Sequence, residues 1–282
     1  MDECVVLNPS VGTKLPELSA LIHCLSGYAH IPQIEVAIGG EQTAIILRHM
    51  TPLTSEDLKH LEDFSQKHAM DIYSHPNQPE TITKLFPNDG NERLKYSLPK
   101  HNLEMLFHPT DFTQVNEEMN QLMIDRALEL LNPQPNETIL DLFCGIGNFT
   151  LAIARYAKHV VGVEGAEAAV QRAKENAIHN NIHNTEFFTA DLSKDCTEMP
   201  WYQRKYDKIL LDPSRAGADG ILAALPSLQA NTIVYVSCNP ATLSRDAGIL
   251  VNQLGYTLQS AGIMNMFPHT AHMESIALFT KE

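Results

Sequence analysis

Four short apolar runs separated by helical segments place the strongest constraint on what the C-terminal part of this chain can fold into. They are ILDLF (139–143), VVGVE (160–164), KILLD (208–212) and IVYVS (233–237). Runs that are apolar almost throughout are typical of strands in a parallel sheet that is covered on both faces. The segments between them have helical spacing, so residues 109–282 are predicted to form an alternating α/β domain.

The predicted elements of this domain make a seven-stranded, mainly parallel, Rossmann-like sheet. A helix is expected over 117–131, ending before Pro133. Strands are expected at 138–143, 160–164, 185–190, 208–212, 232–237, 258–264 and 275–280, and further helices at 149–157, 166–180, 219–228 and 240–254. Sheets of this kind bind ligands beyond the carboxyl ends of their strands.

Residues 1–108 are predicted to form a smaller α/β domain without a catalytic pattern. A helix is expected over 15–28, and a second one after Thr54, whose side chain can cap it. Strands are expected at 34–38 and 44–47 around a Gly-Gly turn, and a hairpin from 94–98 and 105–107. We expect this domain to serve as a scaffold or in substrate docking.

The composition restricts the class of protein and its partners. A chain of 282 residues with 44% hydrophobic residues can bury a core, and its formal net charge is −14. That charge is unusual for a stand-alone RNA binder, because phosphate contacts come mainly from Lys and Arg. The five cysteines form no CxxC pair, and the chain has neither a signal-like start nor an eighteen-residue apolar run. We therefore expect a cytoplasmic protein with reduced thiols and no membrane contact.

A glycine loop and two acidic strand ends favour an adenosine ligand. Gly145 and Gly147 follow a strand and open a helix, so the backbone can approach a ligand closely. Glu164 ends the next strand, where it can bind ribose hydroxyls, and Asp191 ends the third, near an adenine amino group. Either acid alone could equally be a helix N-cap. Thr150 stands where NAD sites have a third glycine, which favours S-adenosylmethionine (SAM) over NAD.

Two further strand ends and the tail carry groups suited to covalent chemistry. Cys238 ends one strand and precedes a helix, whose dipole is expected to stabilise a thiolate. Glu274 has apolar neighbours, which predicts a raised pKa and a role as a base. A buried filler cysteine is the competing interpretation for Cys238. His269 and His272 could suggest a metal site with Glu274, but no recognised ligand spacing supports one.

A thiol, a base and a methyl donor are the groups needed to methylate C5 of uracil. C5 is a poor nucleophile until a thiolate adds at C6 and creates an enolate. A base must then remove the C5 proton before the thiol leaves, and the target nucleotide must be turned out of its stack. Cys238 and Glu274 fit the first two roles.

Five motifs in this order resemble the RNA (uracil-5-)-methyltransferases, and cover the chain from about residue 110 to its end. They are FTQVN (112–116), DLFCGIGNF (141–149), DPSRAG (212–217), VSCNPATL (236–243) and MFPHTAHME (266–274). Within the family, the chain is most similar to the bacterial enzymes that make 5-methyluridine in 23S ribosomal RNA and carry an iron–sulfur cluster. The first hundred residues also resemble part of the central domain of those enzymes.

The resemblance implies a function and the residues that perform it. It implies SAM-dependent methylation of a uridine in 23S ribosomal RNA, with ribosomal RNA as the partner and no obligate protein partner. Cys238 would be the nucleophile and Glu274 the proton-abstracting base. The implied SAM contacts are Gln114, Phe143, Gly145, Asn148, Glu164, Asp191 and Asp212.

The chain departs from the family at its N-terminus, where family members have an OB-like RNA-binding domain and a cysteine-rich cluster loop. Cys4 resembles the last cluster ligand, and would bind metal only with that loop present. We therefore expect no 4Fe–4S cluster here and a weaker hold on RNA. Alternatives are a tRNA 5-methyluridine or RNA 5-methylcytosine enzyme, and a SAM-binding fragment or RNA-binding scaffold without turnover. A small-molecule methyltransferase would not explain the pairing of thiol and glutamate.

Overall fold

The chain divides into two compact units in the computed structural model, which describes residues 3–4, 7–77, 81–266 and 273–281. The first unit comprises residues 1–96 and 107–110, and the second comprises 97–106 and 111–282. A two-stranded hairpin of β5 (Leu94–Leu98) and β6 (Leu103–Phe107) contributes to both. No helix in these described ranges is long and apolar enough to cross a membrane.

The first unit is a four-stranded mixed sheet with helices packed on it. Its elements are α1 (Pro9–Gly12), α2 (Leu15–Cys24), η1 (Tyr28–His30), β1 (Gln33–Gly39), β2 (Gln42–His49), α3 (Ser55–His68), β3 (Met70–Pro76) and β4 (Thr83–Phe86). The strand order is β1-β2-β3-β4, and only β2 and β3 run parallel. Ile45, Leu47 and Ile72 on the sheet share a core with Leu21 of α2 and Leu61 of α3.

Local chemistry explains the helix boundaries in this unit. The Thr54 side chain accepts a hydrogen bond from the Asp57 backbone, and the Asp57 side chain accepts one from Thr54, which makes a reciprocal cap of α3. The helix predicted over 15–28 ends at Cys24, because Leu25 adopts an extended backbone.

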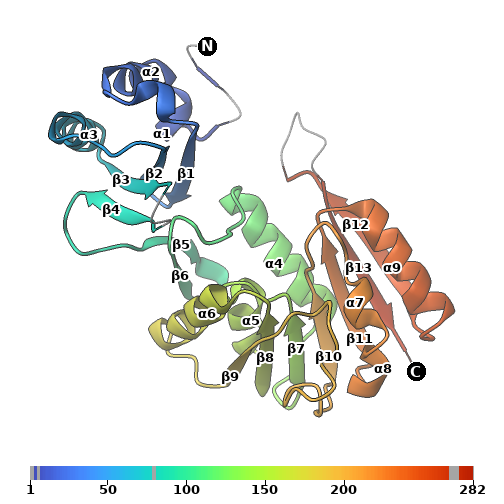
Figure 1. Ribbon diagram of the computed structural model, residues 1–282. Helices are drawn as coiled ribbons and strands as arrows, with labels where there is room; N and C mark the ends of the chain where they lie inside the picture. The colour runs from blue at the N-terminus through green and yellow to red at the C-terminus, as the bar shows by residue number, and fades with distance from the viewer. Residues whose placement is uncertain (1–2, 5–6, 78–80, 267–272, 282) are drawn as a thin grey trace. The chain divides into compact units, whose positions relative to one another are not determined.

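The second unit contains the predicted Rossmann-like sheet, with strand order β12-β13-β11-β10-β7-β8-β9 (Figure 1). Its elements are η2 (Pro99–His101), α4 (Glu117–Leu131), β7 (Thr138–Leu142), α5 (Asn148–Ala154), β8 (His159–Glu164), α6 (Glu167–His179), β9 (Thr185–Thr189), β10 (Lys208–Leu211), α7 (Asp219–Leu222), α8 (Leu225–Leu228), β11 (Thr232–Ser237), α9 (Pro240–Asn252), β12 (Thr257–Met264) and β13 (Glu274–Thr280). Strands β7, β8, β9, β10 and β11 run parallel to one another, and β13 runs antiparallel to both of its neighbours, β11 and β12. The predicted fold class is thus confirmed.

One predicted helix is broken in two. The helix expected over 219–228 is present as α7 and α8, separated by Ala223 and Ala224. Pro226 lies in the first turn of α8, where its missing N–H costs no hydrogen bond. In a continuous helix its ring would clash with the carbonyl of Leu222, which is where α7 ends.

The sheet register brings the predicted functional residues to one edge. Leu142 of β7 pairs with Val163 of β8 and with Leu211 of β10, so the residues that follow these strands emerge together. Ser237 of β11 pairs with Ser275 of β13, whose direction is opposite. The first residue of β13 therefore lies beside the residue that follows β11.

Two asparagines of the α6 region fasten the outer side of β6. The Asn176 side chain accepts from the Leu106 N–H (2.8 Å) and donates to the Leu106 carbonyl (3.0 Å). The Asn180 side chain makes the same pair of bonds with the backbone of Glu104, at 2.9 and 2.8 Å. Asn176 also donates to the Ile146 carbonyl (3.2 Å), so β6 and the glycine loop are fixed to one buried side chain.

Candidate active site

The glycine loop after β7 has a backbone suited to close contact with a ligand. Phe143, Gly145 and Gly147 all have positive φ values, of 67°, 54° and 90°. Glycine adopts such values freely, whereas Phe143 does so at a cost, and residues of this kind are concentrated in functional sites. No atom lies within 4 Å of where a Cβ of Gly145 would stand. The loop therefore has open space at Gly145, which fits the expected SAM cradle.

Glu164 closes this loop from the end of β8. Its Oε2 accepts from the Gly145 N–H (3.2 Å), and its Oε1 accepts from the Ala166 N–H (2.9 Å). Glu164 is not the N-cap of α6, because that position is Ala166 and the helix has no side-chain cap; the second bond reaches only the backbone of Ala166 itself. The first bond joins the carboxylate to the loop, which keeps it beside the open space at Gly145.

Asn148 and a residue that sequence reasoning missed form a reciprocal amide pair. Asn148 is the first residue of α5, and its Nδ2 donates to Asn120 Oδ1 (2.9 Å). Asn120 Nδ2 donates back to Asn148 Oδ1 (3.3 Å). Asn120 is 2% exposed, on the buried face of α4. An asparagine at a helix position with apolar spacing was the available signal for it.

Asp191, which follows β9, already has local partners for its carboxylate. The side chain is exposed and accepts from the Ser193 N–H (3.1 Å), from Ser193 Oγ (2.6 Å) and from Lys194 Nζ (2.9 Å). These bonds lower the pKa of Asp191 to about 2. The carboxylate is therefore ionised at neutral pH, and a ligand amino group would compete with Ser193 and Lys194 for it.

Asp141 is the most deeply buried acid of the loop region. It is 0% exposed; its Oδ2 accepts from Thr150 Oγ1 (2.5 Å), and its Oδ1 is without a partner among the described residues. Burial raises the pKa of Asp141 to about 7. Burial also raises the pKa of the nearby Cys144 thiol well above its ordinary value, which is in keeping with the interpretation of Cys144 as a small core residue.

Cys238, Glu274 and Asp212 form an acidic cluster at the edge of the sheet. The β11–β13 register sets Glu274 beside Cys238, and Glu274 is 7% exposed. Burial raises the pKa of Glu274, as its apolar neighbours predicted, while Arg215 opposes this shift. Burial raises the pKa of Asp212 well above its ordinary value, followed by the charges of Glu274, Asp141 and Glu164.

The expected effect of the helix dipole on Cys238 does not prevail. Cys238 directly precedes Asn239, the N-cap of α9, as the sequence predicted. Burial nevertheless raises the pKa of the thiol above its ordinary value, and the negative charges of Glu274 and Asp212 add to it. Arg215 opposes the shift. The thiol is therefore held in its neutral form until a positive charge approaches or a base takes its proton.

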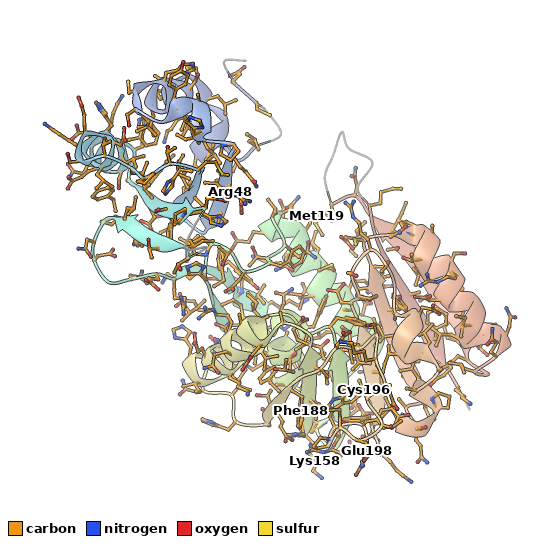
Figure 2. The ribbon with its side chains drawn as sticks, in the orientation of Figure 1. Arg48, Met119, Lys158, Phe188, Cys196 and Glu198 are labelled. Atoms are coloured by element: carbon orange, nitrogen blue, oxygen red, sulfur yellow. The ribbon has the colours of Figure 1, made fainter. Side chains whose placement is uncertain are left out.

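The FTQVN segment connects the loop side of the sheet to the β12–β13 side. Asp111, just before it, pairs with Arg172 of α6 at 2.9 Å. Asn116, its last residue, caps α4 by accepting from the N–H of Met119 (labelled in Figure 2) and donates from Nδ2 to the Met266 carbonyl (2.9 Å). The predicted SAM residue Gln114 lies half-buried between these anchors.

Cys4, which resembles a cluster ligand, belongs to no group of three or more potential metal ligands among the described residues. Across the described ranges, no group of three or more His, Cys, Asp and Glu could hold a metal ion. Cys4 donates its N–H to the Gly12 carbonyl (3.0 Å), and Cys24 is exposed on α2. His269 and His272 lie outside the described residues, so the alternative metal interpretation has no structural test.

The family model and the relatives that match this chain all describe uracil-C5 methyltransferases. The chain matches the sequence family described as tRNA (Uracil-5-)-methyltransferase over residues 83–282. A 23S rRNA (uracil(1939)-C(5))-methyltransferase of Hahella chejuensis is 55% identical over the whole chain, and one of Alkalilimnicola ehrlichii is 49% identical. The chain spans 64% and 63% of the lengths of these two relatives.

A solved structure shares the fold. The tRNA (uracil-54, C5)-methyltransferase of Pyrococcus abyssi, determined in complex with S-adenosyl-L-homocysteine, aligns over 99% of this chain and 69% of its own. The TM-score is 0.77 at 23% sequence identity. The family match covers well over half of the chain, and it includes the glycine loop, the DPSRAG loop, Cys238 and Glu274. The chain belongs to the tRNA (uracil-5-)-methyltransferase family.

Proposed function

We propose that this chain transfers a methyl group from SAM to C5 of a uridine in 23S ribosomal RNA, through a covalent bond from Cys238. The observation that carries the proposal is the pairing of Cys238 with the buried Glu274 at the edge of the sheet that also bears the glycine loop. The names of the two relatives support ribosomal RNA as the substrate. A cytoplasmic location follows only as a prediction from that substrate.

The residues implied by the resemblance fit a SAM site at the glycine loop. Gly145 offers open space, Glu164 lies against the loop, and Asn148 is held by Asn120 at the start of α5. When bound, SAM supplies an electrophilic methyl group. Gln114, Phe143, Asp191 and Asp212 complete the proposed binding set.

Cys238 and Glu274 perform the proton and electron transfers of the proposed reaction. The Cys238 thiolate bonds to C6 of uracil, and the C5=C6 electron pair moves towards C5 and O4 as an enolate. C5 then forms its bond to the methyl group while the bond between that group and the sulfonium sulfur of SAM breaks, so S-adenosyl-L-homocysteine is the leaving group. Glu274 takes the C5 proton, the C5=C6 bond re-forms, and the C6–S bond breaks to return the thiolate. A raised pKa suits Glu274 to hold this proton.

Ribosomal RNA carrying 5-fluorouridine tests the proposal directly. Fluorine at C5 cannot leave as a proton, so the chain, RNA and SAM should form a covalent complex that survives a denaturing gel. The complex should be absent with Cys238→Ala, while SAM binding by calorimetry is retained. With ordinary RNA, Glu274→Gln should accumulate the adduct because the proton is not removed.

The other outcomes identify the alternatives. No complex despite SAM binding would contradict the assignment for residues 1–282, and leave a SAM-binding fragment without turnover. A complex with transfer RNA but not ribosomal RNA would replace the substrate. Methylation of cytidine instead of uridine would replace the base.

A further inference from the structure

Helix α9 carries a fully buried carboxylate, Asp246, that the proposed reaction does not use. The side chain of Asp246 is 0% exposed. Its Oδ2 accepts from Tyr235 Oη (2.5 Å) and from the Ala218 N–H (2.8 Å). Its Oδ1 accepts from Arg245 Nε (2.8 Å). Donors from β11, from α9 and from the segment after β10 therefore converge on one buried carboxylate. A buried carboxylate needs such partners, because it has lost its hydrogen bonds to water.

The same cluster holds the DPSRAG loop (212–217). Arg245 Nη2 donates to the Ala216 carbonyl (2.9 Å), and Asn239 Nδ2 donates to the Arg215 carbonyl (3.1 Å). Gly217 has φ 85°, and a Cβ there would lie 2.5 Å from Arg245 Nη2 and 2.7 Å from Asp246 Oδ2. The loop backbone thus lies directly against the cluster, where only glycine fits.

The hydrogen bond from Asn239 to the Arg215 carbonyl ties this loop to the residue that directly follows Cys238, and Arg215 carries the positive charge that opposes the acidic surroundings of the thiol. The charged groups that act on Cys238 are Glu274 from β13, Asp212 from the end of β10, and Arg215 from the loop. Arg215 alone among them favours the thiolate. Because a charge interaction weakens with distance, the position of the loop sets how far Arg215 offsets the two carboxylates.

We propose that Asp246, with Tyr235 and Arg245, is a positioning residue that fixes the loop carrying Arg215 next to Asn239 and Cys238, and so keeps the thiol reactive. Asp246 contacts neither the thiol nor the substrate in this account. It acts by fixing the loop backbone on both sides of Gly217. The inference rests on the proposed function, since it assumes that Cys238 is the nucleophile.

The test measures the reactivity of Cys238 without RNA. The chain with Asp246→Asn is alkylated with iodoacetamide between pH 6 and 10, and modification of the Cys238 peptide is followed by mass spectrometry. With Arg215 released, alkylation at pH 8 should slow about threefold or more, which corresponds to about half a pKa unit. Tyr235→Phe removes one hydroxyl only and should slow alkylation less than Asp246→Asn does. This milder variant keeps the test available where Asp246→Asn folds poorly.

Asp57→Asn is the matched control. Asp57 is also buried and also accepts hydrogen bonds from a backbone N–H and a hydroxyl, but it lies in the first unit. It should lower stability and leave the alkylation profile of Cys238 unchanged. A purely structural role for Asp246 would give the same result as this control, and would overturn the proposal.

A double variant tests whether Asp246 acts on Cys238 through Arg215. If Asp246 acts through Arg215, then Asp246→Asn should have no further effect on alkylation once Arg215→Ala is present. An equal effect in both backgrounds would contradict the inference. The alkylation result does not depend on RNA, so an absent RNA adduct with a positive alkylation result would refute the proposed function and not the loop contact.

Discussion

At the scale of single residues, the Cys238 thiol is surrounded by more negative than positive charge. Burial and the carboxylates of Glu274 and Asp212 together raise its pKa. A neutral thiol is a poor nucleophile, so the proposed reaction requires that this proton be lost before the thiol attacks. A charged Glu274 raises the pKa of the thiol, so the proposed reaction depends on the protonation state of Glu274, its proposed base.

The first prediction concerns that dependence. Glu274→Gln removes one negative charge beside Cys238, so the pKa of the thiol should fall and its alkylation should begin at lower pH. The measurement is the pH midpoint of Cys238 alkylation, with Glu129→Gln on the exposed surface of α4 as control. An unchanged midpoint in Glu274→Gln would show that the two groups do not interact.

The second prediction concerns Asp141 and the pH dependence of stability. Its pKa rises from 3.8 to about 7 on folding, so the folded chain keeps a proton that the unfolded chain loses first. Stability from the protonated group is thus complete below pH 3.8 and is lost as pH rises to about 7. The loss amounts to about 4 kcal/mol at most, at about 1.4 kcal/mol per pKa unit.

Asp141→Asn should abolish this loss. Relative to the wild type, the variant should gain stability in urea denaturation between pH 5 and pH 8. Asp57→Asn is the reference. Burial raises the pKa of Asp57, but hydrogen bonds from Ser26 and Thr54 outweigh this effect and lower the pKa to about 2. The stability difference between Asp57→Asn and the wild type should therefore not change between pH 5 and pH 8. An Asp141→Asn difference that is equally flat would contradict the account of Asp141.

Residue roles could be predicted only where chemistry leaves a sequence signal. Cys238 and Glu274 were proposed as site residues because a strand end and an apolar neighbourhood are visible in the sequence, and the register sets these two residues side by side. Asp246 and Asn120 were missed, although both occupy apolar-spaced helix positions. Their partners come from distant segments, and no local pattern identifies those. The raised pKa of the Cys238 thiol was also missed, because it depends on burial and on charges that only the fold brings together.

At the scale of elements, the second unit was the easier to predict. Helix α4 has the predicted bounds, and the apolar runs became β7, β8, β10 and β11. Buried parallel strands bounded by helices give clear signals. Strands β3 and β4 of the first unit were missed: β3 begins two residues after the end of α3, without a glycine or proline to mark the change. The split of α7 from α8 was also missed, although Pro226 was visible.

The third prediction tests an element boundary. Thr54→Ala removes the side-chain half of the α3 cap and should destabilise the first unit by about 1 kcal/mol. Amide hydrogen exchange should speed up in α3, with no change in α5 or α9 of the second unit. Ser55→Ala, one residue into the helix, is the control because the cap does not use its side chain. Faster exchange throughout both units would show that they unfold together.

At the scale of the whole molecule, the excess of negative charge limits how the proposed RNA substrate can be bound. With 20 Lys and Arg against 34 Asp and Glu, the formal net charge is −14. Non-specific affinity for RNA comes mainly from release of counterions by basic groups. The proposed function therefore requires recognition through few phosphate contacts and through the binding of the target base.

The fourth prediction follows from this balance. For residues 1–282 and a ribosomal RNA fragment, the slope of log affinity against log salt should be shallower than about −3, which corresponds to about four phosphates or fewer. Filter binding across a range of potassium chloride concentrations measures it, with a polybasic peptide as the steep reference. A steep slope would reveal a concentrated basic surface hidden by the acidic average.

Asn176 and Asn180, which bind the backbone of β6, also affect whether β6 can pair with a further strand. A strand at a sheet edge exposes unused N–H and C=O groups, which can recruit a strand from another molecule. Here the side-chain amides of Asn176 and Asn180 occupy these groups at Leu106 and Glu104, in the manner of a missing neighbour strand. At these two residues the backbone groups that a further strand would bind are therefore already occupied.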